Sequence, residues 1–360
     1  MPDQRPVTDE QRPAADSLDE PDASAPPVDR RSSASAPAKL ILCGEHAVVY
    51  GRPAIALPLA GIRARATVGG ARPGSGISIL ARDLRRRWRL SDEPANPLSE
   101  LIARVLAYLA ARPPAQPHAG VPDLRISIQS TIPIASGMGS GAAVATALVR
   151  ALAAYLGHDL PPAEISALVY ASEQRFHGTP SGIDNTVIAY ELPIWFKRSN
   201  VQTFERSNAP LIEPIGIAAP FTLLIGDTGV RSATRAPVGE VRRRWQAEPD
   251  SYEALFDQVG ALVAQARRAL AQGDLAGLGP ILSENHELLR QIGVSSPELD
   301  GLVGAAQAAG ALGAKLSGAG WGGVMLALVA PERCEPVARA LGAAGAKRVI
   351  ETTVSATGER

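Results

Sequence analysis

The sequence of 360 residues is poor in cysteine, has no net charge and contains no long apolar run. Its two cysteines, Cys43 and Cys334, lie in unrelated contexts without metal-ligand spacing, which favours a reducing compartment over a disulfide framework. Because 36 basic residues balance 36 acidic ones, neither nucleic acid nor an anionic membrane is expected as the main partner. No stretch approaches the roughly 18 apolar residues of a membrane span. We expect a soluble, cytoplasmic protein.

The N-terminal segment, residues 1–35, lacks aromatic residues and the hydrophobic region of a signal peptide. It is rich in Pro, Asp, Glu, Ala and Ser, so it cannot bury enough apolar surface to offset the entropy lost on ordering. We predict a disordered tail. A role for this tail in binding a partner stays open on composition alone.

Hydrophobic periodicity predicts mixed strands and helices in two halves, an α+β protein without the regular alternation of a doubly wound fold. The first half, residues 36–210, should contain strands at 40–42, 54–57, 77–90 (a strand or hairpin with one basic face), 124–133 and 186–196, and helices at 98–111, 142–157 and 162–176. The second half, residues 211–360, should contain strands at 222–229, 313–330 (beside a glycine loop) and 348–355, and helices at 251–274 and 281–293.

One loop places Gly137, Gly139 and Gly141 directly ahead of a predicted helix, in the stretch IPIASGMGSGAAVATALV. The N-terminus of a helix presents unpaired N–H groups that attract phosphate, and glycines let the backbone wrap an anion closely. Ser136 and Ser140 add hydroxyl donors. The loop matches neither a Walker A motif nor G-x-G-x-x-G. Taken alone, a glycine turn that packs against a neighbour explains it as well as a phosphate cradle does.

Two further loops carry polar residues that suit chemistry. EQRFHGTPSGIDN places Glu173 near the end of a predicted helix and Asp184 in the loop beyond it. GEHAVVYG places Glu45 and His46 in a tight loop shortly after Lys39. Each has a common structural explanation, since an Asp in such a loop usually caps a turn and a lone His is usually structural. Three such loops in one chain favour an active site.

Four segments, APAKLILCGEHAVVYG, PIASGMGSGAA, HGTPSGIDN and KLSGAGWGG, together resemble the signature segments of the GHMP small-molecule kinases, in family order between residues 37 and 323. GEHAVVYG and HGTPSGIDN resemble the mevalonate kinase branch in particular. The resemblance implies two domains, S5-like and ferredoxin-like, with the active site between them. It also implies transfer of the γ-phosphoryl of ATP to the 5-hydroxyl of mevalonate, a step of isoprenoid precursor biosynthesis, with Mg²⁺ as cofactor.

The resemblance assigns roles residue by residue. The phosphate-binding loop would comprise Pro133, Ile134, Ala135, Ser136, Gly137, Met138, Gly139, Ser140, Gly141, Ala142 and Ala143. Asp184 would accept or orient the proton of the substrate hydroxyl, beside Lys39, and Glu173 with Ser140 would hold Mg²⁺. Glu45, His46, Ser181, Gly182 and Thr234 would line the substrate pocket. The third segment, residues 315–323, would pack against the phosphate-binding loop.

Three departures from the family pattern stand out. Gly141 replaces the second of two adjacent serines, so the hydroxyl of Ser140 or a water would have to take its place beside the metal. Trp321 replaces a glycine, and capping of the loop is favoured over stacking on the nucleotide. Val324 stands where a cysteine is frequent.

Two other functions stay open. The same fold would serve phosphomevalonate kinase, a mevalonate 3-kinase or a sugar kinase, and Arg231 and Arg235 would be available to a phosphorylated acceptor. A relative that binds nucleotide and metabolite without turnover is favoured by Gly141 alone and opposed by Lys39, Glu173 and Asp184. The sequence also leaves a homodimer open.

Overall fold

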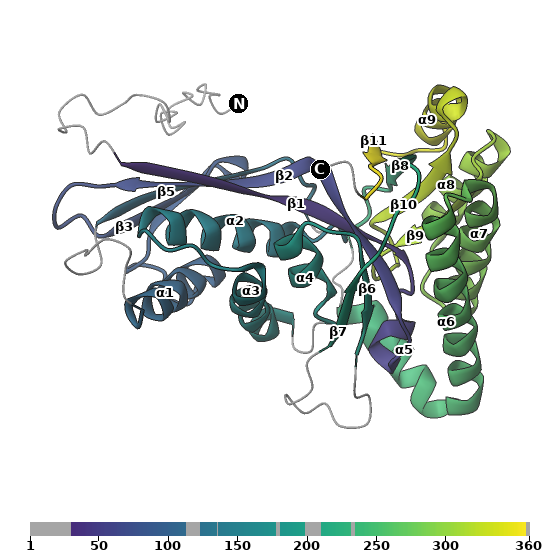
Figure 1. Cartoon of the computed structure of the whole chain (residues 1–360), viewed down its shortest axis with the longest axis horizontal. Helices are drawn as coiled ribbons and strands as arrows, with labels where there is room; N and C mark the ends of the chain where they lie inside the picture. The colour runs from purple at the N-terminus through teal and green to yellow at the C-terminus, as the bar shows by residue number, and fades with distance from the viewer. Residues whose placement is uncertain are drawn as a thin grey trace, which may run out of the picture.

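The computed structural model describes residues 30–112, 123–134, 136–177, 181–198, 210–231 and 235–357, which form two β-sheets with helices packed on them (Figure 1). The first sheet has the order β4-β3-β5-β2-β6-β7, with β1 paired to β2. Its strands are β1 (Arg31–Cys43), β2 (Ala54–Gly70), β3 (Ile77–Ala81), β4 (Arg86–Arg89), β5 (Leu124–Ser130), β6 (Ile194–Lys197) and β7 (Leu211–Pro214).

Alternation of side chains builds the first sheet. In β5, Leu124, Ile126 and Ile128 are buried while Arg125 and Gln129 are exposed, as the sequence predicts. Helices cover one side of this sheet (Figure 1), and the buried side chains of the sheet and the helices form one hydrophobic core. These helices are α1 (Pro97–Ala110), α2 (Ser140–Tyr155) and α3 (Pro162–His177), joined by the short α4 (Ile183–Tyr190).

The second sheet is antiparallel, with the order β11-β8-β10-β9. Its strands are β8 (Phe221–Asp227), β9 (Gly313–Ser317), β10 (Val324–Val329) and β11 (Arg348–Val354). Its helices are α5 (Arg235–Ala247), α6 (Pro249–Gln272), α7 (Leu275–Ile292), α8 (Pro297–Ala308) and α9 (Cys334–Ala343). No helix in the described part of the chain is long and apolar enough to cross a bilayer.

The prediction for residues 186–196 was wrong over most of its length. Residues 183–190 form α4, and only β6 at Ile194–Lys197 is a strand. The β-branched residues Thr186, Val187 and Ile188 favour a strand, but all three are buried in the helix, so packing overrides their local preference. Gly182, at φ 89°, starts the helix in a conformation that suits glycine.

Both predicted domain limits differ from the ends of the sheets. Strand β1 begins at Arg31, which opposes Gly69 of β2, so residues 31–35 belong to the sheet and not to the predicted tail. Residues 1–29 lie outside the described part of the chain. Strand β7 pairs with β6 in the first sheet, although the second half was predicted to begin at residue 211.

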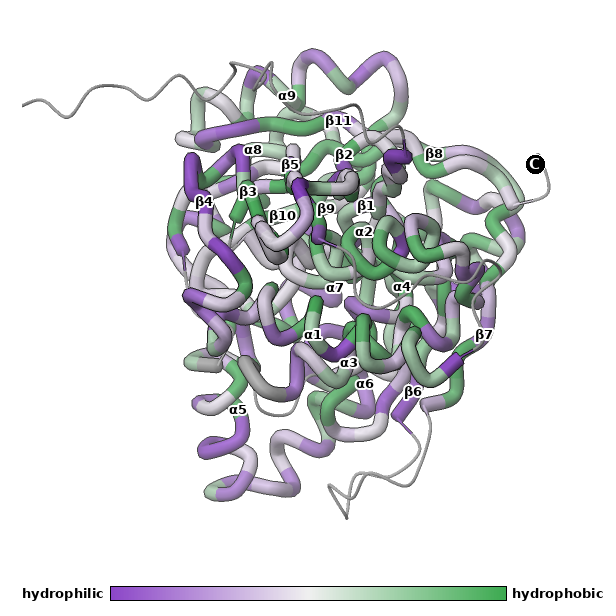
Figure 2. Tube along the Cα trace, turned by 90° about the vertical axis from the view of Figure 1, so that its left-hand side faces the viewer, coloured by the Kyte–Doolittle hydropathy of each residue, from purple (hydrophilic) through white to green (hydrophobic). Residues whose placement is uncertain are grey.

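The arginine-rich stretch after Ile77 is a hairpin, in agreement with the sequence. Strand β3 pairs antiparallel with β4, and Trp88 is the buried residue of β4. Figure 2 shows β4 at the edge of the molecule as a hydrophilic segment. The hairpin therefore exposes most of its arginines to solvent.

Candidate active site

The glycine loop between β5 and α2 leaves the start of α2 open to an anion. Gly139 precedes the helix at φ 71°, and no side chain caps the first turn. A Cβ on Gly139 would lie 2.9 Å from Ile188 and 3.0 Å from Lys39, so this position requires glycine. Gly137, at φ 82°, lies against Ser317 and Gly318 of the third segment. The unpaired N–H groups and the helix dipole suit a phosphate.

The side chains of this loop divide into inward and outward sets. Ser136 is buried and its hydroxyl donates to the carbonyl of Pro133 at 2.8 Å, so it stabilises the loop instead of offering a hydroxyl to a ligand. Met138, Ala142 and Ala143 are also buried. Ile134 and Gly141 are exposed, and Pro133 and Ser140 are half-buried. Ala135 lies outside the described residues.

Lys39 connects this loop to Asp184. The backbone N–H of Lys39 donates to the carbonyl of Met138 at 3.0 Å, and its Nζ lies 2.9 Å from Oδ1 of Asp184. The lysine is buried, whereas the Asp184 side chain is 32% exposed. The sequence suggested that Asp184 lies in a loop, but it lies in the first turn of α4. The carboxylate is thus accessible to a ligand while its partner cation is held in place.

Glu173, on α3, belongs to the same electrostatic cluster. Its pKa is raised to about 8, mainly by burial and also by the negative charge of Asp184, while the positive charge of Lys39 opposes the rise. Two neighbouring carboxylates with one cation form a place where a divalent ion would relieve the repulsion. The residues present therefore suit Mg²⁺, which takes one or two carboxylates and completes its shell with phosphate and water. No cluster of three or more potential metal ligands occurs in the described part of the chain.

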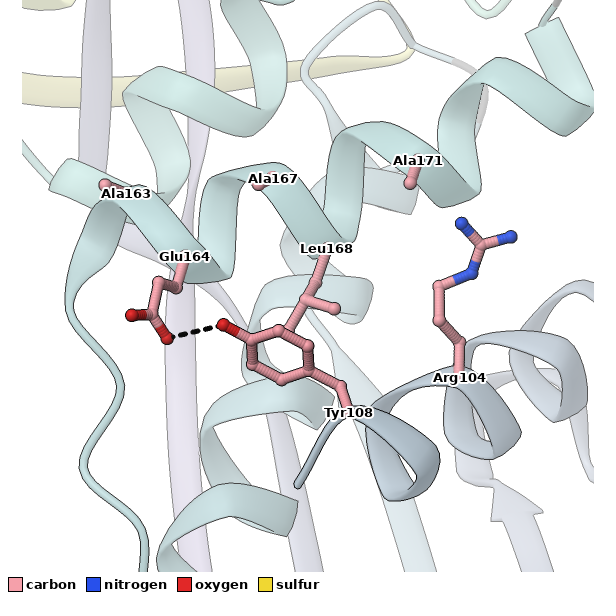
Figure 3. A pocket seen from close by; sticks show the side chains of 7 residues that line it. All are labelled: Arg104, Tyr108, Ala163, Glu164, Ala167, Leu168 and Ala171. Carbon is pink, nitrogen blue, oxygen red and sulfur yellow. Dashed lines mark hydrogen bonds between the residues drawn. The ribbon is translucent and has the colours of Figure 1, made fainter. Parts of the chain in front are cut away.

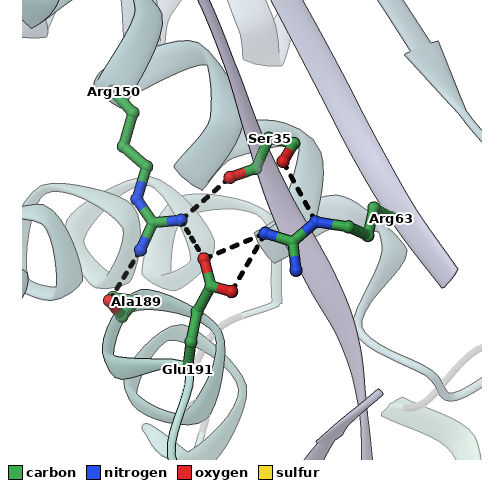
Figure 4. Close-up of polar contacts among 5 residues, drawn as sticks. All are labelled: Ser35, Arg63, Arg150, Ala189 and Glu191. Atoms are coloured by element: carbon green, nitrogen blue, oxygen red, sulfur yellow. Dashed lines mark hydrogen bonds and ion pairs between the residues drawn. The ribbon is translucent and has the colours of Figure 1, made fainter. Parts of the chain in front are cut away.

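A network of arginines fixes the far end of α4 (Figure 4). Arg150 of α2 donates to the carbonyls of Ser35 and Ala189 at 2.9 and 2.8 Å. Arg63 of β2 donates to both carboxylate oxygens of Glu191, at 3.0 and 2.9 Å. Because this network ties α4 to β1, it holds the helix that carries Asp184 against the strand that carries Lys39.

Glu45 and His46 are buried by the second sheet. Glu45 is 1% exposed and accepts a hydrogen bond from Nζ of Lys315, which is 0% exposed and also donates to the carbonyl of Leu316 at 2.6 Å. Burial raises the pKa of Glu45, and the charge of Lys315 opposes the rise. His46, at φ 59°, contacts the carbonyl of Ala319 through Nε2 at 2.9 Å. In this conformation both residues fasten the two sheets together.

The third segment, residues 315–323, also connects the two sheets. The hydroxyl of Ser317 donates to the carbonyl of Ile41 at 2.9 Å and accepts from its N–H at 3.2 Å. Trp321 donates through Nε1 to the carbonyl of Gly293 at 2.9 Å. The tryptophan thus fastens the loop to the end of α7, which agrees with the capping interpretation.

The remaining predicted residues surround the start of α4. Ser181 is half-buried and its hydroxyl accepts from the N–H of Ile183 at 3.3 Å. Gly182 lies against Phe196 and Tyr170. Thr234 lies outside the described residues. Apart from Ala135 and Thr234, the predicted residues occur on segments that meet around Lys39, although Glu45 and Ser136 are buried and engaged.

A hollow of about 470 Å³ lies away from these residues, between α1 and α3 (Figure 3). It is lined by three alanines and Leu168, with Tyr108 donating to Glu164 at 2.8 Å at one side. It contains none of the predicted site residues. We therefore place the candidate site at the junction around Lys39.

Sequence reasoning missed the role of Lys315, which it treated only as the first residue of the third segment. A single lysine in the apolar strand GAKLS is the available signal, because a buried charge needs a partner. The sequence offers no signal that the partner is Glu45, since the two residues lie 270 positions apart.

Comparison with known proteins places the chain in a family. Two family models match, GHMP kinases N terminal domain over residues 100–191 and GHMP kinases C terminal over residues 266–347. The mevalonate kinase of Thermococcus sibiricus is 36% identical over 346 residues, which is 92% of this chain and 98% of that protein. The chain belongs to the GHMP kinase family. The predicted resemblance is confirmed, and this GHMP kinase is an ATP-dependent small-molecule kinase.

Solved structures share the fold of this GHMP kinase. L. major mevalonate kinase in complex with R-mevalonate has a TM-score of 0.75 and 29% identity, covering 90% of this chain and 96% of that one. Streptococcus pneumoniae phosphomevalonate kinase has the same TM-score of 0.75 at 19% identity, covering 89% and 99%. The two-domain GHMP kinase fold is therefore confirmed. Because both structures fit equally well, the fold by itself does not select the acceptor.

Proposed function

We propose that this kinase transfers the γ-phosphoryl of ATP to the 5-hydroxyl of mevalonate in the cytoplasm. The relatives of 36% identity that span most of the chain are mevalonate kinases, which supports the acceptor. The observation that carries the mechanism is the buried Lys39 paired with the accessible Asp184 beside the glycine loop. The two unpaired cysteines agree with a reducing compartment.

In the proposed mechanism, the chain contributes mainly positioning and charge stabilisation, which phosphoryl transfer requires. The N–H groups at the start of α2 bind the phosphates of ATP. Asp184 accepts a hydrogen bond from the attacking hydroxyl and orients its oxygen. Lys39 keeps Asp184 in position, and its positive charge stabilises negative charge that develops on the incoming oxygen. His46 and the loop Ser181–Gly182 are proposed to shape the substrate pocket.

We propose Glu173 and Ser140 as the residues that hold Mg²⁺. The half-buried carboxyl of Glu173 has no hydrogen bond or ion pair within the described ranges, and its charge repels that of Asp184. When bound, Mg²⁺ would neutralise charge on the phosphates of ATP. Binding would also require Glu173 to lose its proton.

The contacts of Arg231 favour an acceptor without a phosphate group over a phosphorylated one. Both of its terminal nitrogens are engaged by the two carboxylate oxygens of Asp227, each at 2.8 Å. A bidentate pair of this kind leaves little of the guanidinium for a phosphate. The side chain of Arg235 lies outside the described residues.

The proposed function is tested by ADP release from the full chain with ATP and Mg²⁺. Mevalonate, phosphomevalonate and galactose are compared, and the product is identified by phosphorus NMR. Turnover on mevalonate with the phosphate on the 5-oxygen is the expected result. Turnover on phosphomevalonate or galactose instead would show that the acceptor is wrong. Binding of ATP without turnover on any acceptor would favour a non-catalytic relative.

A first prediction concerns Glu173 and pH. Its folded-state pKa of about 8 lies above the ordinary value of 4.5, so the protonated carboxyl favours the folded state. The stabilisation of the folded state by protonated Glu173 is fully present below about pH 4.5 and is lost as the pH rises through about 8. Without metal, Glu173→Gln should therefore be more stable than the parent at pH 8.5, by about 2–5 kcal/mol, and equal to it near pH 4.

Thermal unfolding in EDTA at several pH values measures this difference. Glu164→Gln on the same helix is the matched control. A hydrogen bond from Arg112 and a weaker effect of one from Tyr108 lower the pKa of Glu164. Its replacement should therefore bring no gain in stability at high pH. Equal stability of Glu173→Gln and the parent at pH 8.5 would contradict the prediction, because it would show that ionisation of Glu173 does not destabilise the folded state.

A second prediction concerns Gly141. Nothing lies within 4 Å of a Cβ built on this residue, so a serine fits in the first turn of α2. Gly141→Ser should lower the Mg²⁺ concentration for half-maximal activity several-fold, because it adds a hydroxyl next to Ser140. Gly141→Ala is the control, since it raises helix propensity at least as much as serine does, by about 1 kcal/mol over glycine, without the oxygen. An equal effect of both variants on magnesium would contradict the prediction.

A further inference from the structure

One face of the first sheet carries a cluster of arginines. Helices α1, α2 and α3 cover the opposite face (Figure 1), and the strand register identifies the residues on the uncovered one. One row across the sheet reads Arg31, Gly69, Arg125, Ser78 and Arg89. The next row reads Ser33, Thr67, Ser127, Leu80 and Arg87, and a third contains Ser35, Arg65 and Gln129. We call Arg31, Arg65, Arg87, Arg89 and Arg125 the arginine face.

The charge of the arginine face is not compensated within the described ranges. All five arginines are exposed, and none has a hydrogen bond or ion pair from its side chain to another described residue. The nearby Arg63 and Arg86 differ, because Glu191 and Glu93 pair with them. No acidic residue occurs in the three rows, which contain mostly Arg, Ser, Thr and Gln.

The acids next to the rows are already engaged with backbone. Asp123, before β5, accepts from the N–H groups of Gly74 and Gly76 at 2.7 and 2.6 Å. Asp83 accepts from the N–H of Ser130, at the other end of β5. Within the first row the arginines lie on alternate strands, about 10 Å apart, so their like charges repel one another most strongly at low ionic strength. Such a face suits an anionic ligand.

The sequence supplies a matching negative charge next to this face. Residues 1–29 contain eight acidic and two basic residues. Since the whole chain has 36 of each sign, residues 30–360 carry a net charge of +6 and residues 1–29 carry −6. The acidic segment joins β1 at Arg31, which is itself part of the arginine face. Twenty-nine residues can span up to about 95 Å, whereas five strands are about 20 Å wide.

We propose that the arginine face is a docking surface for the acidic segment of this chain, residues 1–29. The covalent connection gives the segment an effective concentration on the order of millimolar, so even weak charge pairing is sufficient. A second copy that docks through the same face would bring like charges together, which argues against a dimer through this surface. Docking of the segment shields the arginines from other polyanions, nucleic acid included.

Zero-length crosslinking of the full chain tests the contact directly. The chain has four lysines, of which Lys39 and Lys315 are buried, so a carbodiimide has few competing targets. Arg65→Lys and Arg125→Lys each place an amine on the face without changing its charge. We expect crosslinks from these positions to carboxylates of residues 1–29 within one chain at 25 mM salt, and their loss at 500 mM.

Arg268→Lys, an exposed position on α6, is the matched control and should give no such crosslink. Absence of crosslinks from positions 65 and 125, an equal yield from position 268, or crosslinks between chains would overturn the proposal. ATP-dependent turnover should stay within about twofold in every variant, because none of these residues lies in the proposed site. The outcome is therefore independent of the acceptor.

Binding of a labelled single-stranded DNA tests the shielding. Replacing the eight acids of residues 1–29 by Asn and Gln should tighten DNA binding at least tenfold at 50 mM salt. Adding Arg65→Glu and Arg125→Glu should reverse the gain, whereas Arg268→Glu with Arg333→Glu, which changes net charge equally, should not. Equal DNA binding by the parent and the neutralised variant would overturn the proposal. Tight binding by the parent itself would instead assign the face to nucleic acid.

Discussion

Asp184→Asn should lower kcat by about 100- to 10,000-fold while the affinity for ATP changes by less than about threefold. The substitution keeps the shape of the side chain but removes the charge that pairs with Lys39 at 2.9 Å. An amide orients the substrate hydroxyl less well and accepts no proton from it. The phosphates of ATP bind at the start of α2, which this change leaves intact. Steady-state kinetics and nucleotide titration of the same preparation separate the two effects.

The control for Asp184 is Asp159→Asn, an exposed acid after α2 that should keep normal turnover. Unfolding temperatures of both variants are measured as well, because Asp184→Asn leaves the buried ammonium of Lys39 without its anion. If Asp184→Asn is folded and retains more than about a tenth of the parental kcat, Asp184 is not at the chemistry.

Lys315→Met should cause the largest loss of stability, about 3–5 kcal/mol. It removes the cation from a pair whose side chains are 0% and 1% exposed and leaves Glu45 in the interior. The second carboxylate oxygen of Glu45 already lacks a hydrogen-bond partner among the described residues. The loss should appear as a drop of roughly 10 °C in unfolding temperature.

The pH dependence of this loss distinguishes charge from packing. The folded-state pKa of Glu45 lies above its ordinary value of 4.5, and the variant raises it further because Lys315 opposed the rise. The stability that the protonated carboxyl provides is present below about pH 4.5 and is lost as the pH rises through the folded-state pKa. The destabilisation should therefore grow between pH 5 and pH 8. A loss that is the same at both pH values would indicate a packing defect.

The double variant Glu45→Gln/Lys315→Met completes the test. It removes both charges, so most of the lost stability should return. Because the pair joins the loop after β1 to strand β9, the single variant should also weaken substrate binding through His46. No recovery in the double variant would show that the lysine stem, and not its charge, supports the junction.

Local sequence was sufficient where one element decides its own structure. The alternation of β5 and the helical spacing of α6 predicted both elements, because each buries one regular face. Local patterns failed for α4, whose β-branched residues resemble a strand until Gly182 and the packing around Val187 are known. They also missed α8 and α9, two short helices that pack on the second sheet.

By itself, the sequence determined the family, the glycine loop and the identities of Lys39, Glu173 and Asp184, because motifs are written in consecutive residues. The tertiary structure decided what each residue contacts. It buried Ser136 against Pro133, paired Glu45 with Lys315 and gathered the arginine face from four strands. These contacts join residues far apart in the chain, and burial, which sets their charges and pKa values, exists only after the sheets have packed.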